Sequence, residues 1–449
     1  MKLAGNGHRA SMRISVFGTG YLGATHAACL ASTGHTVVGI DVDPARTAHL
    51  SLGRAPFHEP GLDRLLAAGV ASGRLTFDTR PEAAAGAEVH FLCVGTPQRA
   101  GSEAADLSAL EDAVDSLAPL LDGPCLVVGK STVPVGTARL LAARLSAAAP
   151  AGTEVGVAWN PEFLRESRAV EDSLRPDRLV FGVAGEEALQ ILRRVYADAI
   201  AAGVPVVRTD LETAELAKVS ANAMLATRIS TVNLLAEVCE ASGADVSDLT
   251  EILGLDARIG IKFLNPGLGY GGGCLPKDTR AFVARAEELG VGRSAALLRD
   301  VDAVNLRQRA RTVDLAIEML DGLVAGARIA VLGAAFKAGS DDIRDSPALA
   351  VASSLQGLGA HVGVYDPMAA PAVSRHFPRL RSAASWVEAC TDADLVLVLT
   401  DWEEFRSIDP VALSAVVARP RAIDARLVLD EEKWRAAGWE LFVLGRGSR

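Results

Sequence analysis

The chain has 449 residues, of which 49% are hydrophobic and 22% are charged, and its formal net charge at pH 7 is −10. This length predicts two or three domains rather than one core, and the composition is ordinary for a globular protein. The negative charge argues against nucleic acid or an anionic membrane surface as the main partner, and no uninterrupted apolar run is long enough to span a bilayer.

The first eleven residues, MKLAGNGHRAS, lack the apolar core of a signal peptide and are predicted to form a loose tail. The six cysteines are scattered, with neither paired nor metal-ligand spacing, so we expect a cytoplasmic protein without a metal site. Cys274 lies in a run of glycines. The other five lie in apolar stretches and are interpreted as small core side chains: Cys29, Cys93, Cys125, Cys239 and Cys390.

Strand and helix patterns alternate in the N-terminal part of the chain. Residues 13–20 (RISVFGTG) form an apolar run that ends in glycines, a helical pattern follows, and residues 35–43 (HTVVGIDVD) form a second apolar run. Similar runs occupy residues 89–97 and 125–134. Continuous apolar strands separated by helices predict a parallel sheet covered on both faces, so we assign residues 12–208 to a Rossmann-like domain.

Residues 209–242 have helical periodicity and contain neither Pro nor Gly. Thr209 and Glu212 have capping-box spacing at the start of this segment, and Gly243 follows its end. A helix of this length spans about 45 Å, which is too long for a surface helix of one small domain. We therefore interpret it as a connector and as the spine of a homodimer, within a helical domain at residues 209–310.

The α/β pattern returns from about residue 325. Residues 327–336 (ARIAVLGAAF) resemble a strand and a glycine turn, and residues 361–367 (HVGVYDP) a strand that ends in an aspartate, with a helical pattern between them. This weak repeat assigns residues 320–445 to a second α/β domain. The predicted fold is therefore α/β, with two Rossmann-like doubly wound parallel-sheet domains joined by a long central helix and a helical middle domain.

Gly18, Gly20 and Gly23 form the sequence GTGYLG between the first strand and the first helix, and Asp41 ends the second strand. In a dinucleotide-binding turn the first glycine allows the turn, the second lets backbone approach a pyrophosphate, and the third lets the helix pack on the sheet. Asp41 would bind the adenosine ribose and repel a 2′-phosphate, so the cofactor expected is NAD. Arg46 could stack on adenine, although a surface arginine is the simpler interpretation.

Cys274 lies in GYGGGCLPKD, just before a run with a helical pattern. A thiol at a helix N-terminus is in an electropositive position, which favours the nucleophilic thiolate. Asp278 could orient a water or accept a proton, and Lys277 could hold an anion. A glycine-rich turn with a capping aspartate explains the same residues equally well.

Three further pairings are ambiguous by themselves. Lys218 and Asn222 are four residues apart and share one face of the long helix, where a solvated lysine is the commoner case. Glu162 and Glu166 have the same spacing, which an acid-rich helix start would also give. Thr132 follows a strand, where turn chemistry is the alternative.

Taken together, these segments resemble the UDP-glucose/GDP-mannose dehydrogenase family over nearly the whole chain. GYGGGC with LPKD is the most specific match, followed by ELAKVSANA. The others are GTGYLG, DVD, HEPGL, VGTP, KSTVP, NPEFLRES, RIGIKFLNPGLGYGGGCLPKD and AAFKAGSDDIRDSPA. FLNPGLGYGGG is closer to the UDP-glucose branch, whereas LPKD also occurs in GDP-mannose relatives.

The resemblance implies that a nucleotide-sugar C6 alcohol is oxidised twice, to a carboxylate, with two NAD and one water. Cys274 would form a thiohemiacetal and then a thioester with C6, and Lys218 and Asn222 would stabilise the oxyanion. Asp278 with Thr132 would hold or activate water. Glu162 would assist hydrolysis and orient the substrate.

The same resemblance implies the binding residues. Those for NAD are Gly18, Gly20, Tyr21, Leu22, Gly23, Asp41, Arg46, Thr96, Thr132, Glu166, Lys277 and Arg344. Those for the nucleotide sugar are Glu162, Phe163, Leu164, Lys218, Asn222, Phe263, Leu264, Asn265, Gly267, Gly271 and Lys337, with Arg258 reaching the partner subunit's sugar site. Gly273 departs from the family, which usually has serine before the cysteine; the nucleophile remains, and we expect activity to remain with it.

Three hypotheses stay open at this point. The first is the four-electron dehydrogenase, acting on UDP-glucose or, alternatively, on GDP-mannose or a UDP-N-acetylhexosamine. The second is a two-electron 3-hydroxyacid-type dehydrogenase, which would not need Cys274. The third is a nucleotide-sugar-binding or redox-sensing protein without turnover. The number of NADH formed per sugar separates them.

Overall fold

A computed structural model of the chain describes residues 11–447. The chain divides into two compact units, Met1–Ser220 and Ala221–Arg449, and each is described by itself. The loose tail predicted for the first eleven residues lies outside the described residues, except for Ser11.

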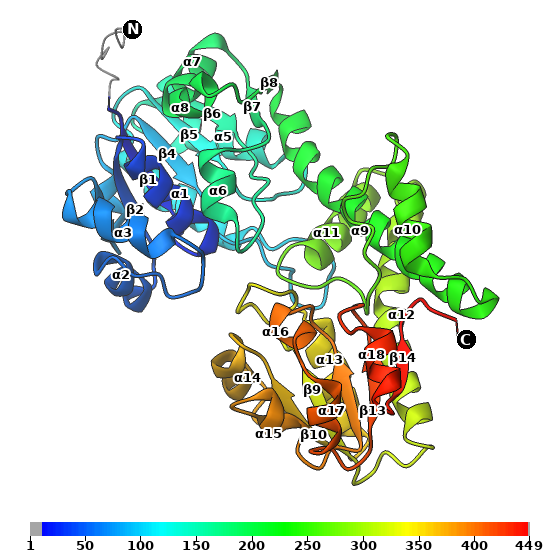
Figure 1. Ribbon diagram of the computed structural model, residues 1–449. Coiled ribbons are helices and arrows are strands. Elements are labelled where there is room, and N and C mark those ends of the chain that lie inside the picture. The colour runs from blue at the N-terminus through cyan, green and yellow to red at the C-terminus, as the bar shows by residue number, and fades with distance from the viewer. Residues whose placement is uncertain (1–10, 448–449) are drawn as a thin grey trace, which may run out of the picture. The chain divides into compact units, whose positions relative to one another are not determined.

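The first unit is built on one sheet, whose strand order within the described chain is β3-β2-β1-β4-β5-β6-β7-β8 (Figure 1). Its strands are β1 (Arg13–Phe17), β2 (Thr36–Ile40), β3 (Leu75–Asp78), β4 (Val89–Leu92), β5 (Cys125–Gly129), β6 (Val155–Trp159), β7 (Leu179–Val183) and β8 (Val206–Thr209). Neighbouring strands are parallel, except that β7 runs antiparallel to β6.

Helices cover both faces of this sheet, as the continuous apolar strands predict. Helices α1, α3 and α7 share one buried apolar cluster, and α4 and α5 share the cluster on the other face. The helices of this unit are α1 (Tyr21–Ser32), α2 (Pro44–Ser51), α3 (Leu62–Ala71), α4 (Ser108–Leu117), α5 (Thr137–Ala148), α6 (Ala169–Leu174), α7 (Glu186–Val195) and α8 (Ala197–Ala201). The doubly wound prediction is therefore confirmed.

The second unit repeats the topology of the first. Its sheet has the order β11-β10-β9-β12-β13-β14 in the described part of the chain, the same winding as the first six strands of the first unit, and all of its pairs are parallel. The strands are β9 (Arg328–Leu332), β10 (His361–Tyr365), β11 (Arg381–Ser382), β12 (Leu395–Val398), β13 (Arg421–Asp424) and β14 (Glu440–Val443). The weak repeat seen in the sequence is thus a structural repeat.

Helices precede and surround this second sheet. They are α10 (Val246–Leu255), α11 (Leu275–Glu288), α12 (Ala296–Met319), α13 (Pro347–Gly357), α14 (Ala370–His376), α15 (Trp386–Cys390), α16 (Glu403–Arg406), α17 (Pro410–Ser414) and α18 (Glu431–Ala436). Helices α12 and α13 pack on one face through a cluster that includes Ala316 and Leu355, while Trp434 of α18 lies in the cluster on the opposite face.

The long helix expected near residue 209 is α9 (Leu211–Ser242), and it continues through the boundary between the units. Its predicted capping box was wrong: Thr209 belongs to β8, and Asp210 accepts hydrogen bonds from the N–H (2.7 Å) and hydroxyl (3.0 Å) of Thr213. Gly243 follows the helix with a φ of +78°, as the C-terminal glycine predicts.

Candidate active site

The turn between β1 and α1 shows why glycines stand at its three positions. A Cβ on Gly18 would lie 2.8 Å from the Val94 backbone, and a Cβ on Gly23 would lie 1.8 Å from the Gly18 carbonyl oxygen. A Cβ on Gly20, by contrast, would meet nothing within 4 Å. Close packing therefore explains the first and third glycines, whereas the second faces open space at the N-terminus of α1, where a pyrophosphate would fit.

Asp41 follows β2 and is buried beside this turn. Its carboxylate accepts hydrogen bonds from the Thr19 N–H (2.7 Å) and the Asp43 N–H (3.0 Å), and pairs with Arg46 Nη1 at 2.9 Å. Burial acts to raise the pKa of Asp41, but the hydrogen bonds from Asp43 and Arg46 outweigh it and hold the pKa below its ordinary value. The ionised carboxylate fits a ribose hydroxyl, and Arg46 is placed by this ion pair.

Thr96 and Thr132 meet at the carboxyl ends of β4 and β5. The Thr96 hydroxyl donates to the Thr132 carbonyl oxygen at 2.7 Å, and the Ser131 hydroxyl donates to the Val94 carbonyl oxygen at 2.6 Å. The glycine turn and Asp41 lie at the same edge, after β1 and β2. This is the switch point of a doubly wound sheet, where such folds bind dinucleotides.

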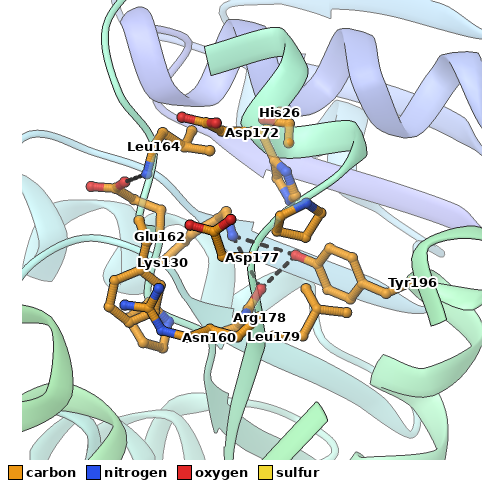
Figure 2. A pocket seen from close by; sticks show the side chains of 14 residues that line it. His26, Lys130, Asn160, Glu162, Leu164, Asp172, Asp177, Arg178, Leu179 and Tyr196 are labelled. Carbon is orange, nitrogen blue, oxygen red and sulfur yellow. Dashed lines mark hydrogen bonds between the residues drawn. The ribbon is translucent and has the colours of Figure 1, made fainter. Parts of the chain in front are cut away.

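Glu162, Phe163 and Leu164 lie in the loop that follows β6, beside a pocket in the first unit (Figure 2). Glu162 accepts the Leu164 N–H at 2.6 Å and forms an ion pair with Lys218 of α9 at 3.0 Å. The Arg178 guanidinium stacks 3.7 Å from the Phe163 ring centroid. Lys218 and Glu162, which the sequence placed separately, are thus direct partners.

A buried lysine beneath this loop was missed by the sequence interpretation. Lys130 Nζ donates to Asn160 Oδ1 at 3.1 Å and to the Tyr196 hydroxyl at 3.4 Å (Figure 2), and Asn160 Nδ2 donates to the Val180 carbonyl oxygen at 3.0 Å. Burial lowers the pKa of Lys130 from 10.5 to about 8. The sequence does contain an indication of this site, because Lys130 directly follows an apolar strand and precedes Thr132 by two residues.

Cys274 occupies the N-cap position of α11 in the second unit, and its side chain is exposed. Pro276 is the second residue of this helix. Asp278, one turn into the helix, is buried and accepts hydrogen bonds from Asn222 Nδ2 at 2.6 Å and Lys277 Nζ at 2.5 Å. The structure therefore brings Asn222, Lys277 and Asp278 together behind the cysteine.

The glycines before Cys274 leave no room for side chains. A Cβ on Gly271 would lie 2.3 Å from the Asp345 carbonyl oxygen, one on Gly272 2.8 Å from the Phe336 ring, and one on Gly273 2.4 Å from Arg344 Cζ. The Gly272 N–H also donates to the Arg344 carbonyl oxygen at 2.9 Å. Segment 271–273 is therefore packed directly on segment 336–345, which carries the expected binding residues Lys337 and Arg344.

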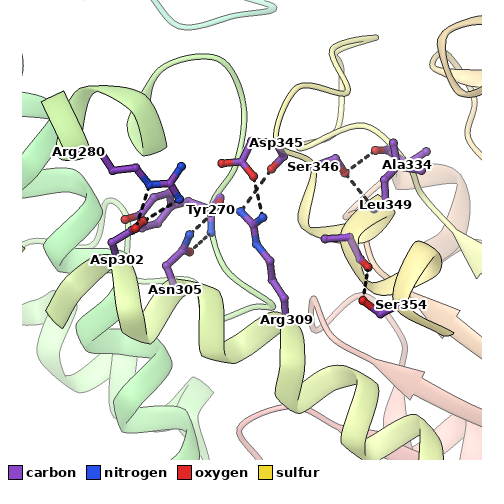
Figure 3. Close-up of polar contacts among 11 residues, drawn as sticks. Tyr270, Arg280, Asp302, Asn305, Arg309, Ala334, Asp345, Ser346, Leu349 and Ser354 are labelled. Atoms are coloured by element: carbon purple, nitrogen blue, oxygen red, sulfur yellow. Dashed lines mark hydrogen bonds and ion pairs between the residues drawn. The ribbon is translucent and has the colours of Figure 1, made fainter. Parts of the chain in front are cut away.

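Helix α12 holds both of these segments (Figure 3). The side chain of Asn305 accepts the Tyr270 N–H at 2.7 Å and donates to the Tyr270 carbonyl oxygen at 3.1 Å. Arg309 Nη2 donates to the same carbonyl oxygen at 3.0 Å, while its Nη1 pairs with Asp345 at 2.7 Å. On the neighbouring turn, Arg280 of α11 pairs with Asp302 at 3.0 Å. These contacts fix the backbone that leads into Cys274.

The remaining predicted sugar residues lie on the segment before the glycines. Phe263 has a φ of +61°, Leu264 is buried and Asn265 is exposed. The Gly267 N–H donates to Asn233 Oδ1 at 2.8 Å. Arg258 lies farther back, with its side chain 90% exposed and paired with Asp256 at 2.6 Å.

Within residues 11–447, no group of three His, Cys, Asp or Glu side chains is placed to hold a metal ion. Across the same residues, no helix is both long and apolar enough to cross a membrane.

Comparison with known proteins gives one consistent result along the chain. The UDP-glucose/GDP-mannose dehydrogenase family matches with its NAD binding domain at residues 12–200, its central domain at 212–307 and its UDP binding domain at 330–431. A UDP-glucose 6-dehydrogenase of Rhizobium meliloti (strain 1021) is 40% identical over 97% of this chain and 100% of its own length.

Solved structures agree with this result. A UDP-glucose dehydrogenase from the hyperthermophilic archaeon Pyrobaculum islandicum superposes with a TM-score of 0.90 at 35% identity, and the match covers 100% of both chains. A UDP-D-ManNAc dehydrogenase from Pyrococcus horikoshii superposes with a TM-score of 0.86 at 30% identity, over 97% of this chain and 100% of its own.

The buried lysine gives a prediction for stability. The folded protein releases the Lys130 proton near pH 8, whereas the unfolded chain keeps it to about pH 10.5, so the protonated form favours unfolding between these values. The contribution of Lys130 to the free energy of unfolding therefore rises with pH across this range. Relative to Lys130→Met, the parent's free energy of unfolding should increase by about 2 kcal/mol from about pH 7 to about pH 9.5, measured by urea denaturation.

The exposed Lys433 supplies the control for this measurement. Lys433→Met should track the parent across the same pH range. A constant difference between the parent and Lys130→Met at both pH values would show that Lys130 is not the group that titrates.

The glycine segment gives a second prediction. Gly271→Ala should lower the free energy of unfolding by about 1–3 kcal/mol, because its Cβ would meet the Asp345 backbone, which cannot move independently. Gly273→Ala should cost less than about 0.5 kcal/mol, because its obstacle is the end of the Arg344 side chain. Neither glycine has a positive φ, so the pair isolates the effect of packing. Equal losses in chemical denaturation would contradict this explanation.

Proposed function

The chain belongs to the UDP-glucose/GDP-mannose dehydrogenase family, and we propose that it acts as a UDP-glucose 6-dehydrogenase, oxidising UDP-glucose to UDP-glucuronate with two NAD⁺ and one water. That it is an NAD-dependent dehydrogenase follows from the family, so the proposal concerns the sugar and the route. The observation that carries it is the exposed Cys274 at the N-terminus of α11, with Asp278 held behind it by Asn222 and Lys277.

The residues of the glycine turn fit the dinucleotide. Gly20 leaves open space at the N-terminus of α1, and the ionised Asp41 suits an unphosphorylated ribose. Main-chain N–H groups of Tyr21 and Leu22 would face the phosphates. When bound, NAD⁺ supplies the hydride acceptor, and two are needed because conversion of an alcohol to a carboxylate removes four electrons.

Cys274 would supply the covalent step between the two oxidations. Its thiolate adds to C6 of the aldehyde, forming a C–S bond and placing negative charge on the former carbonyl oxygen. After the second oxidation C6 is a thioester; water adds to it, the C–S bond breaks, and the thiolate leaves as the carboxylate forms. The N-terminus of α11 favours the thiolate both when it attacks the aldehyde and when it leaves the thioester.

Lys218 and Asn222 are the proposed oxyanion donors. Asn222 gives one amide hydrogen to Asp278, which leaves its second hydrogen for the substrate oxygen. Lys218 brings an ammonium group that already pairs with Glu162. A donor of this kind is worth about 3–4 kcal/mol in the transition state. Asp278 with Thr132 is assigned to the water, and Glu162 to substrate orientation and hydrolysis.

The choice of UDP-glucose within the family has its own support. The UDP binding domain matches at residues 330–431, and the Rhizobium meliloti relative that matches over its full length is named for UDP-glucose. The motif FLNPGLGYGGG points to the same branch. UDP-N-acetylhexosamines and GDP-mannose remain the alternatives, and a substrate panel with NAD and NADP separates them. None of the six cysteines, all of which lie within the described residues, is joined to another in a disulfide, which supports a cytoplasmic location.

A homodimer through the central helices completes the proposal. Large apolar side chains are exposed on neighbouring helices of the second unit: Met224 on α9, and Ile252 and Leu255 on α10, with exposed fractions of 72%, 66% and 80%. These exposed apolar side chains form the proposed interface, because burial against a partner would remove them from water. Arg258, three residues after Leu255, would then reach the partner's sugar site.

The stoichiometry of the reaction tests the covalent route. The parent should form two NADH per UDP-glucose consumed, and Cys274→Ser should lower the rate of UDP-glucuronate formation by at least about 10³-fold, because the alcohol is a far weaker nucleophile. NADH absorbance and chromatography of the sugar products measure both. Cys125→Ser, at a half-buried cysteine, should keep the parent stoichiometry.

One result would rule the covalent route out. If Cys274→Ser makes UDP-glucuronate at the parent rate, no sulfur-bound intermediate is required. A yield of one NADH per sugar from the parent would instead favour the two-electron alternative.

The dimer has a separate test. Leu255→Arg with Ile252→Arg should convert the protein to monomers in sedimentation velocity, because two buried charges would be unpaired across the interface. Val411→Arg, at an apolar residue of α17 that is 63% exposed, is the control and should leave the oligomeric state unchanged. A monomeric parent would remove the dimer from the proposal and leave the chemistry intact.

A further inference from the structure

Glu59 lies in the HEPGL motif, to which neither the fold nor the proposed chemistry gives a role. The residue is 6% exposed in the segment between α2 and α3. One carboxylate oxygen accepts the Tyr21 hydroxyl, and the other accepts the Val170 N–H at 3.1 Å. In the described chain no Lys, Arg or His forms an ion pair with it. Through these two hydrogen bonds the buried carboxylate joins the start of α1 to the start of α6, and we call this contact the Glu59 junction.

Tyr21 connects this junction to the glycine turn. It is the first residue of α1, its ring packs 5.0 Å from that of Phe57, and its hydroxyl accepts the Ser167 N–H at 2.9 Å while donating to Glu59. Burial and the hydrogen bond to Glu59 raise the pKa of Tyr21 far above its ordinary value, so the hydroxyl stays protonated and remains a donor. The side chain is thus fully engaged by protein groups, whereas its main-chain N–H belongs to the turn.

The loop between β6 and α6 depends on these two side chains. Its Leu164 and Arg165 N–H groups are satisfied from nearby in sequence, by Glu162 at 2.6 Å and Asp172 at 2.9 Å. The Ser167 N–H instead donates to the distant Tyr21 hydroxyl. Ser167 has a φ of +68°, which a residue other than glycine adopts only when its surroundings hold it.

We propose that Glu59 and Tyr21 are positioning residues that fasten the loop carrying Glu162 and Glu166 to the glycine turn. The glycine turn, which holds the dinucleotide phosphates, then keeps a fixed position relative to the loop that presents the two carboxylates. The roles of Glu162 and Glu166 rest on the proposed function, but the fastening itself does not. In this proposal the main chain of Tyr21 contacts NAD, whereas its hydroxyl holds the loop through Ser167 and Glu59.

Tyr21→Phe tests the fastening, because it keeps the ring on Phe57 and removes only the hydroxyl. In the ligand-free protein, amide hydrogen exchange at residues 164–170 should become at least ten-fold faster, since the Ser167 N–H loses its acceptor. NAD binding, measured by calorimetry without sugar, should weaken by about three- to ten-fold. Glu59→Gln should change exchange in the same direction, because the amide cannot accept from both donors as the carboxylate does.

Ser167→Gly supplies the rescue. Glycine adopts a positive φ without the steric penalty of serine, so Tyr21→Phe/Ser167→Gly should recover most of the lost NAD affinity, whereas the N–H of residue 167, which still lacks the Tyr21 acceptor, should keep its faster exchange. The control is Tyr365→Phe, which removes the hydroxyl of the last residue of β10, a donor to Glu404 of α16 at 3.0 Å. It should leave exchange at residues 164–170 and NAD binding unchanged.

Two outcomes would overturn the proposal. Unchanged exchange at residues 164–170 in Tyr21→Phe would show that the hydroxyl does not hold the loop. Weaker NAD binding that Ser167→Gly does not rescue would show that the hydroxyl acts on NAD directly. Both readouts are made without a sugar, so they remain valid if the stoichiometry experiment rejects UDP-glucose oxidation.

Discussion

The position of Cys274 depends on a steric constraint, the lack of space around residues 271–273. Each of these glycines lies against the segment 336–345 so closely that a Cβ would overlap it. Helix α12 fixes both sides of this contact through Asn305 and Arg309. The thiol therefore stands on backbone that is held by packing rather than on a mobile loop, and α11 begins directly behind it. Gly273 extends this packing, because the Arg344 guanidinium occupies the place of a serine side chain.

Irregular segments at the carboxyl ends of the strands are ordered by side chains that satisfy backbone donors. In the first unit Glu162 and Asp172 do so for the loop after β6. In the second unit Asp366 has the same role after β10, where it accepts the Ala334 and Ala369 N–H groups at 2.7 and 2.8 Å. A buried carboxylate that collects main-chain donors lets a parallel sheet end in loops without leaving those donors unpaired.

The features that the sequence predicted correctly are those determined by residues close together in the chain. The glycine turn and Asp41 lie within one βαβ unit, so their spacing alone located the switch point of the first sheet. The helix cap was wrong by one residue because Thr209 and Asp210 both carry a capping oxygen, and only the extent of β8 separates them. The fold class followed from strand and helix periodicity, which survives in both halves of the chain.

Long-range partners could not be predicted. Lys130 meets Tyr196, Arg309 meets Asp345, and Tyr21 meets Glu59, across 66, 36 and 38 residues of sequence respectively. No local pattern marks such pairs, because their distance is set by how the helices return to the sheet. At Gly273, where the resemblance leads one to expect serine, a Cβ would lie 2.4 Å from Arg344 Cζ, a contact that no local pattern indicates.

The reversal between β6 and β7 has a consequence for how this architecture can vary. Because Trp159 pairs with Gly182 in antiparallel register, the chain leaves β6 and enters β7 at the same rim of the sheet. The twenty or so residues between them never have to traverse the sheet, and their closure entropy grows only slowly with length. A change in the length of this segment would therefore alter the lining of the pocket while every parallel pairing of the sheet stays in register.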